Sequence, residues 1–163
     1  MKKPKAKRKV APSQLAFGLF ASMDTEIYSS LHDEIMLWLD RNAEHIVAEL
    51  FPNRPLRKLQ RQWEYPVTAT NRKEEYIAGF IDLAVGVSDE QPIYFEVKTD
   101  MKLGVLFRQL AAYRFYLHNN RVYEDEPSKL SGPFVVVSPD DRHAELIRQQ
   151  GYRFYKYVPS LGA

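Results

Sequence analysis

Two acidic residues and a lysine lie within apolar segments of the sequence, where charged side chains are uncommon. Asp82 belongs to residues 79–83, and Glu96 and Lys98 belong to residues 92–99. Ionised groups in buried strands must be compensated by opposite charge or by a metal ion. Carboxylates that converge from two strands are suitable ligands for Mg²⁺ or Mn²⁺, which polarise a phosphate and lower the pKa of bound water. These residue types therefore predict metal-dependent hydrolysis of phosphodiester bonds.

The spacing of these residues decides whether they can meet. Side chains at positions i and i+2 of a strand face the same side, so Glu96 and Lys98 project together. Residues 88–91 predict a hairpin loop, and pairing across it brings Asp82 close to Glu96 unless the register slips by one residue. The alternative is a surface Glu–Lys pair on an exposed edge strand, which is common and contributes little. The surrounding residues favour core strands instead: Ile81, Leu83, Val85, Ile93, Phe95 and Val97.

The periodicity of apolar residues predicts the elements that hold this site. Helical spacing is predicted over residues 24–50, 103–117 and 140–150, with Gly151 ending the last helix. Extended segments are predicted over residues 56–68, 76–87, 92–99, 132–138 and 152–158, with a charged turn at 71–75. The order helix, three strands, helix, strand, helix, strand predicts one three-layer α/β domain, a mixed β-sheet flanked by helices.

The first predicted helix carries an acid on the face assigned to the core. At about 100° per residue, the residues that cluster on this face are Ile27, Leu31, Ile35, Trp38, Asn42 and Ile46. Glu34 falls within it, which predicts a third acid near Asp82 and Glu96. His32 lies almost on the opposite side of the helix from Glu34, so it is predicted to be a surface histidine.

The next predicted helix adds two polar residues to the pattern. Gln109 and Tyr113 share one face at i, i+4 spacing. Together with Asp82 and the Glu96-Val97-Lys98 triplet, they resemble the PD-(D/E)xK nuclease superfamily and are most similar to its RecB-like branch. The resemblance covers roughly residues 24–139, with isoleucine in place of the nominal proline before Asp82.

The resemblance implies a restriction-endonuclease-like fold with an αβββαβ core and a nuclease that requires Mg²⁺ or Mn²⁺. By position in the family's motifs, the catalytic residues would be Glu34, Asp82, Glu96 and Lys98. The three acids among them would bind the metal ion. Gln109 and Tyr113 would contact the substrate or buttress the site. His32 could correspond to the helix histidine of some RecB-like enzymes, but its helical phase favours the surface position instead.

Positive charge is concentrated at the N-terminus. Six of the 23 basic residues lie before Val10, which leaves 17 basic against 21 acidic residues in the remainder. Residues 1–13 are predicted to be a disordered basic arm, and residues 14–163 a single nuclease-like domain. Such an arm binds nucleic-acid phosphates or serves as a solubilising tail, and both interpretations stay open. The other residues expected to hold the phosphate backbone are Arg54, Arg57, Lys58 and Arg61.

Composition and motifs exclude several other classes of protein. No apolar run approaches the length of a membrane span, no secretory signal is evident, and the absence of cysteine excludes disulfides and thiolate zinc sites. A cytoplasmic location is expected, or a nuclear one if the source is a eukaryote or a eukaryotic virus. A nuclease acting on DNA is favoured. Three alternatives stay open: an inactive nucleic-acid-binding module of the same fold, a subunit or homodimer within a nucleoprotein complex, and an RNA endonuclease.

Overall fold

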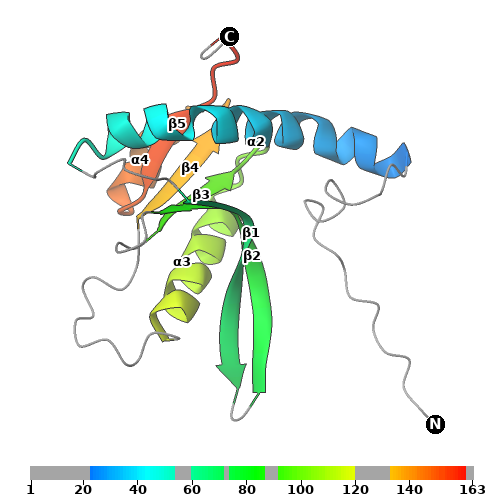
Figure 1. Ribbon diagram of the computed structural model, residues 1–163, viewed down its shortest axis with the longest axis vertical. Helices are drawn as coiled ribbons and strands as arrows, with labels where there is room; N and C mark the ends of the chain where they lie inside the picture. Colours follow the sequence, from blue (N-terminus) through cyan, green and yellow to red (C-terminus); the bar gives the residue numbers. More distant parts are fainter. Residues whose placement is uncertain (1–22, 54–59, 72–73, 87–91, 120–132, 161–163) are drawn as a thin grey trace.

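The protein is built as a sheet between two layers of helices. The computed structural model describes residues 23–53, 60–71, 74–86, 92–119 and 133–160. Helix α2 (Met23–Leu50) covers one face of the sheet, and α3 (Leu103–Asn119) and α4 (Ala144–Gln149) cover the other (Figure 1). The predicted N-terminal arm lies outside the described residues, as do Arg54, Arg57 and Lys58.

The sheet is mixed and its strands follow the order of the sequence. They are β1 (Gln60–Asn71), β2 (Glu74–Gly86), β3 (Ile93–Val97), β4 (Phe134–Ser138) and β5 (Arg153–Lys156). Strands β1 to β3 are antiparallel, whereas β3, β4 and β5 run parallel. Each parallel connection includes a helix, because parallel strands require a long crossover. The predicted three-layer α/β fold and element order are confirmed.

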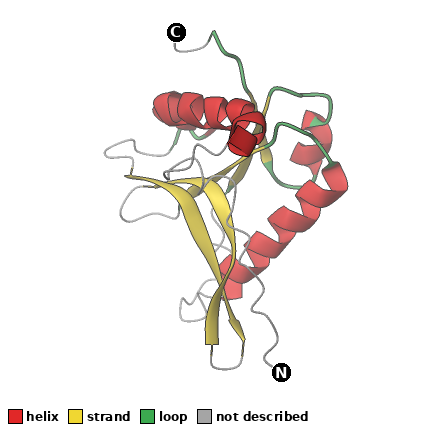
Figure 2. Cartoon of the chain, turned by 90° about the vertical axis from the view of Figure 1, so that its right-hand side faces the viewer, coloured by secondary structure: helices red, strands yellow, loops and turns green. Residues whose placement is uncertain are grey.

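The hairpin of β1 and β2 is longer than the sequence predicts. The two strands remain paired as far as Asn71 and Glu74, so most of the predicted turn at 71–75 is strand. Cross-strand pairs such as Thr68–Ile77 and Ala69–Tyr76 bring β-branched and aromatic side chains opposite their partners, which extends the ladder. Figure 2 shows the distal half of this hairpin extending well beyond the rest of the sheet.

Each face of the sheet carries its own hydrophobic cluster. The α2-side cluster joins that helix to β3 and β4, with Phe95 and Val135 fully buried. The α3-side cluster joins α3 and α4 to the opposite face, around Tyr94 and Leu110. All five residues of β4 are buried, as its continuous apolar run predicts. Within the described ranges, no helix combines the length and apolar character needed to cross a membrane.

Candidate active site

Asp82 and Glu96 meet where strands β2 and β3 separate. The ladder between these strands ends at the pair Leu83–Phe95. Beyond it, the Val97 backbone N–H donates to Asp82 Oδ2 at 2.8 Å, and the Asp82 N–H donates to Glu96 Oε2 at 3.4 Å. The carboxylates therefore take the place of ladder hydrogen bonds, and both are held at the same end of the sheet.

Burial makes Glu96 an unusual acid. Its side chain is almost completely buried, and this desolvation is the main reason that its pKa rises to about 8. The negative charge of Asp82 raises the pKa further, while Lys98, whose Nζ lies 3.4 Å from Glu96 Oε1, acts in the opposite direction. Burial and the charge of Asp82 therefore favour the protonated form of Glu96 when no additional cation is present.

His32 reaches the site from helix α2. Its Nε2 atom lies 3.4 Å from Asp82 Oδ1, and its side chain is 24% exposed. Burial lowers the pKa of His32, but the contact with Asp82 and the charge of that carboxylate outweigh this effect, so the pKa is raised above 6.5. The favoured prediction, that His32 is a surface histidine, is wrong.

Glu34 does not join Asp82 and Glu96, because the face of α2 that packs on the sheet differs from the predicted one. Glu34 is exposed, and its Oε1 accepts a hydrogen bond from the Tyr157 hydroxyl at 3.1 Å. The predicted face included Leu31, which is 41% exposed. The helix instead buries Ile35, Met36, Trp38, Leu39, Ala43, Ile46 and Val47. This set centres the inner face on the side of His32, nearly opposite Glu34.

Helix α3 holds Glu96 from the other side through Gln109 and Tyr113. Gln109 Nε2 donates to Glu96 Oε1 and to the Tyr113 hydroxyl, both at 3.0 Å. The Tyr113 hydroxyl donates to the Phe80 carbonyl oxygen at 3.1 Å, which anchors α3 to β2. Burial and the charge of Glu96 raise the pKa of Tyr113 to about 12, so it remains a neutral donor. Gln109 Oε1 is buried and has no hydrogen-bond partner among the described residues.

Gly79 makes room for Tyr113, and we expect Gly79→Ala to destabilise the protein. A Cβ atom at this position would lie 2.8 Å from Tyr113 Cε1, so the ring would have to move away from Phe80. Forcing an extra methyl group into such a contact costs about 1–3 kcal/mol of unfolding free energy. Urea denaturation of the two proteins would measure the difference.

Gly104→Ala is a matched control for this substitution. Gly104 lies in the first turn of α3, and a Cβ atom there would meet nothing within 4 Å. We expect this change to leave the stability unchanged or to raise it slightly, since alanine favours helices. Equal stability of the Gly79→Ala variant and the wild type would contradict the role assigned to the contact.

Arg61 lies apart from the site. Its guanidinium is 3.7 Å from Asp40 Oδ1 and 3.6 Å from Glu44 Oε1, so it joins β1 to α2. The Trp63 indole N–H also donates to Asp40, at 3.1 Å. A phosphate contact by Arg61 would therefore compete with these ion pairs. Its predicted partners Arg57 and Lys58 lie outside the described residues.

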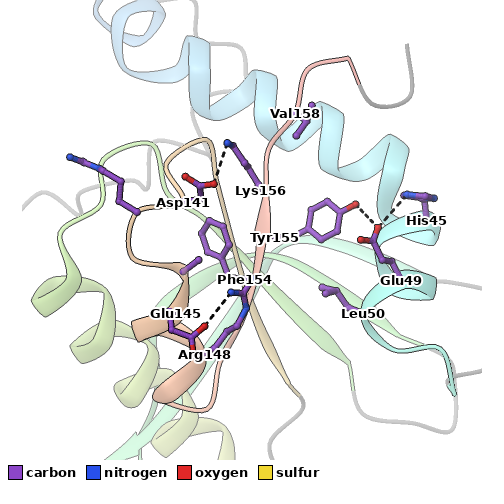
Figure 3. A pocket seen from close by; sticks show the side chains of 12 residues that line it. His45, Glu49, Leu50, Asp141, Glu145, Arg148, Phe154, Tyr155, Lys156 and Val158 are labelled. Carbon is purple, nitrogen blue, oxygen red and sulfur yellow. Dashed lines mark hydrogen bonds and ion pairs between the residues drawn. The ribbon is translucent and has the colours of Figure 1, made fainter.

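A groove of about 770 Å³ lies elsewhere, between the C-terminal half of α2, β5 and α4 (Figure 3). Several charged side chains along it form pairs with one another: His45 with Glu49, Asp141 with Lys156, and Glu145 with Arg148. None of the residues that line the groove belongs to the candidate site. The groove therefore does not extend that site.

The donor set at the fork of β2 and β3 fits a divalent cation. In the described part of the chain, no three side chains of histidine, cysteine or acidic residues are already arranged as a metal-binding cluster. Mg²⁺ commonly needs only one or two protein carboxylates, with water and substrate oxygens completing its shell. Asp82 raises the pKa of Glu96, and a cation between the two carboxylates would relieve this repulsion.

Comparisons with known proteins leave the function open. No protein-family model matches the sequence, and no curated protein matches it. Two solved structures are similar in part of their fold. An "EndoMS-dsDNA2 complex" is 17% identical with a TM-score of 0.40, covering 74% of this chain and 44% of that one. A repair endonuclease from Pyrococcus abyssi is 16% identical with a TM-score of 0.40, and the match covers 74% of this chain and 47% of the endonuclease chain. This chain thus spans less than half the length of either.

Proposed function

We propose that this chain is a nuclease that hydrolyses phosphodiester bonds, with DNA as its substrate and Mg²⁺ or Mn²⁺ as its cofactor. The observation that carries the proposal is the pair of carboxylates buried side by side at the fork of β2 and β3. Asp82 and Glu96 lie beside Lys98 and His32, and His32 balances a second negative charge only while it is protonated. When His32 is neutral, one of the two carboxylates must hold a proton or face a further cation. Acids perturbed in this way are typical of functional sites.

Asp82, Glu96 and His32 are the proposed metal ligands, and Gln109 supports one of them. A bound metal ion would polarise the scissile phosphate and lower the pKa of a water molecule. Asp82 and Glu96 would hold this ion, and His32 in its neutral form is a candidate further ligand because its Nε2 faces Asp82 Oδ1. Glu96 must first release its proton. Gln109 would keep the Glu96 carboxylate in place through its donated hydrogen bond.

Lys98 would act on the substrate rather than on the protein fold. Its ammonium group lies beside Glu96 and is partly exposed, with 23% of the side chain accessible. From there it can orient the attacking water or stabilise the charge that develops on phosphate oxygens. The proposal that DNA is the substrate rests on the basic N-terminal sequence and on the resemblance to the RecB-like branch.

The direct test is cleavage of nucleic acids by the purified full-length chain. Single-stranded, duplex and branched DNA and RNA would be incubated with Mn²⁺, with Mg²⁺ or with EDTA. We expect cleavage of DNA that requires metal, stops in EDTA and weakens steeply with salt. Lys98→Ala should reduce cleavage at least about 10²-fold while leaving Mn²⁺ binding intact.

Lys102→Ala provides the matched control, because Lys102 is an exposed lysine whose ion-pair partner among the described residues is Asp100. This variant should cleave like the wild type. Tight binding of nucleic acid without cleavage under any condition would instead favour the inactive binding module. Preferential cleavage of RNA would favour the RNA endonuclease. If the protein neither binds Mn²⁺ nor cleaves any of these substrates, the proposed function is wrong.

A further inference from the structure

Glu64 has an unusual backbone conformation for a residue within a strand. Its φ angle is 51°, and no other non-glycine residue in the described ranges has a positive φ. This left-handed region is unfavourable for an L-residue with a long side chain, and it persists only where the surrounding structure enforces it. Residues held in such conformations cluster at functional sites.

Glu64 lies on β1 directly opposite Asp82 on β2. The pairs on either side of this position are Trp63–Leu83 and Tyr65–Ile81. The register is the same before and after it, so no residue has been inserted into either strand. The distortion is therefore a local change of backbone direction, placed beside one of the two acids of the candidate site.

The hairpin changes the face that it presents to the helices at this position. Trp63 and Leu83 pack with the α2-side cluster, whereas Tyr65 and Ile81 pack with the α3-side cluster. Residues i and i+2 of a regular strand share one face, so this exchange requires a turn of the backbone at Glu64. Figure 1 shows the hairpin of β1 and β2 curving away from the rest of the sheet between its base and its distal half.

This change of face takes Asp82 out of the regular ladder. The β2–β3 pairing stops at Leu83, and the Asp82 carboxylate accepts the hydrogen bond of the Val97 amide instead. We infer that Glu64 is a positioning residue whose left-handed backbone conformation places the Asp82 carboxylate at the fork of β2 and β3. Its importance for catalysis rests on the proposed function, but its effect on Asp82 does not.

The Val97 amide proton reports directly on Asp82, because it is donated to that carboxylate. Its NMR chemical shift would be measured in the full chain with three substitutions at Glu64. Glycine and asparagine accept a positive φ, whereas valine disfavours it strongly. Asp82→Ala, which removes the acceptor, supplies the reference shift for the broken hydrogen bond.

We expect Glu64→Gly and Glu64→Asn to keep the wild-type shift of the Val97 amide. Glu64→Val should move it upfield, toward its position in Asp82→Ala, and should weaken Mn²⁺ binding by calorimetry at least tenfold. Gln62→Val, which introduces the same residue at an exposed position of β1, should change neither. An unchanged Val97 shift in Glu64→Val, or a lost hydrogen bond in Glu64→Gly and Glu64→Asn, would overturn the inference.

A second measurement keeps the inference testable if Glu64→Val does not fold. Urea midpoints of Glu64→Gly and Glu64→Ala would then be compared, since both remove the side chain but only glycine tolerates a positive φ without strain. The glycine variant should have the higher midpoint, and an equal or lower one would contradict the role of the backbone. Because the Val97 shift is independent of cleavage, an inactive wild type would refute the proposed function and leave this inference standing.

Discussion

Asp82→Asn is expected to abolish metal-dependent cleavage while the protein stays folded. Asparagine keeps an oxygen that can accept the hydrogen bond from the Val97 amide N–H, so the contact between β2 and β3 at this point should be preserved. It removes the charge that would attract the metal ion. A metal ion contributes several kcal/mol to transition-state stabilisation, so the cleavage rate should fall by about 10³-fold or more. Single-turnover cleavage at saturating Mn²⁺, together with Mn²⁺ titration by calorimetry, would measure both effects.

Two other acids provide controls for the loss of charge. Asp100→Asn removes an exposed carboxylate whose ion-pair partner within the described ranges is Lys102, and it should retain wild-type cleavage. Glu34→Gln should also retain it, because Glu34 contacts Tyr157 rather than the two buried acids. Full cleavage by Asp82→Asn would contradict the metal site proposed here. Loss of cleavage by Glu34→Gln would instead restore the role that the family pattern assigns to this residue.

Glu96 should make the metal-free protein less stable as the pH rises. Burial raises its pKa from 4.5 to about 8, so the folded protein keeps a proton that the unfolded chain releases between these values. The contribution of this proton to stability is complete below about pH 4.5 and is lost as the pH approaches 8. One such proton changes the free energy of unfolding by up to about 1.4 kcal/mol per pH unit.

Urea denaturation in EDTA at several pH values between 5 and 8 would measure this slope. The raised pKa of His32 changes stability in the same direction, so the contribution of Glu96 is the difference between wild type and Glu96→Gln. Glutamine cannot ionise, and we expect its variant to lose most of the slope and to exceed the wild type in stability near pH 8. Glu75→Gln, the same change on the exposed distal part of β2, should keep the wild-type slope. Identical slopes for Glu96→Gln and wild type would show that Glu96 is ionised in the folded state.

Much of the site could be predicted from the sequence, because short-range geometry fixes it. Glu96 and Lys98 share a face through the period of a strand, and Gln109 and Tyr113 share one through the period of a helix. A hairpin between residues 76–87 and 92–99 predicted the antiparallel pairing that brings Asp82 to Glu96, and apolar neighbours on both strands indicated burial. The predicted loop itself, at 88–91, lies outside the described residues. None of these relations depends on residues far away in the chain.

The rotation of α2 and the bend at Glu64 were decided only by the tertiary structure. Apolar residues occupy a wide arc of that 28-residue helix, so several rotations satisfy its sequence equally well. Packing against β3 and β4 selects the one that turns His32 toward Asp82 and leaves Glu34 near Tyr157. The sequence around Glu64 gives no indication of its positive φ, because it is an ordinary strand sequence and the residue is a glutamate. We infer that packing imposes this conformation, because Trp63 and Leu83 pack on the α2 side of the sheet whereas Tyr65 and Ile81 pack on the α3 side.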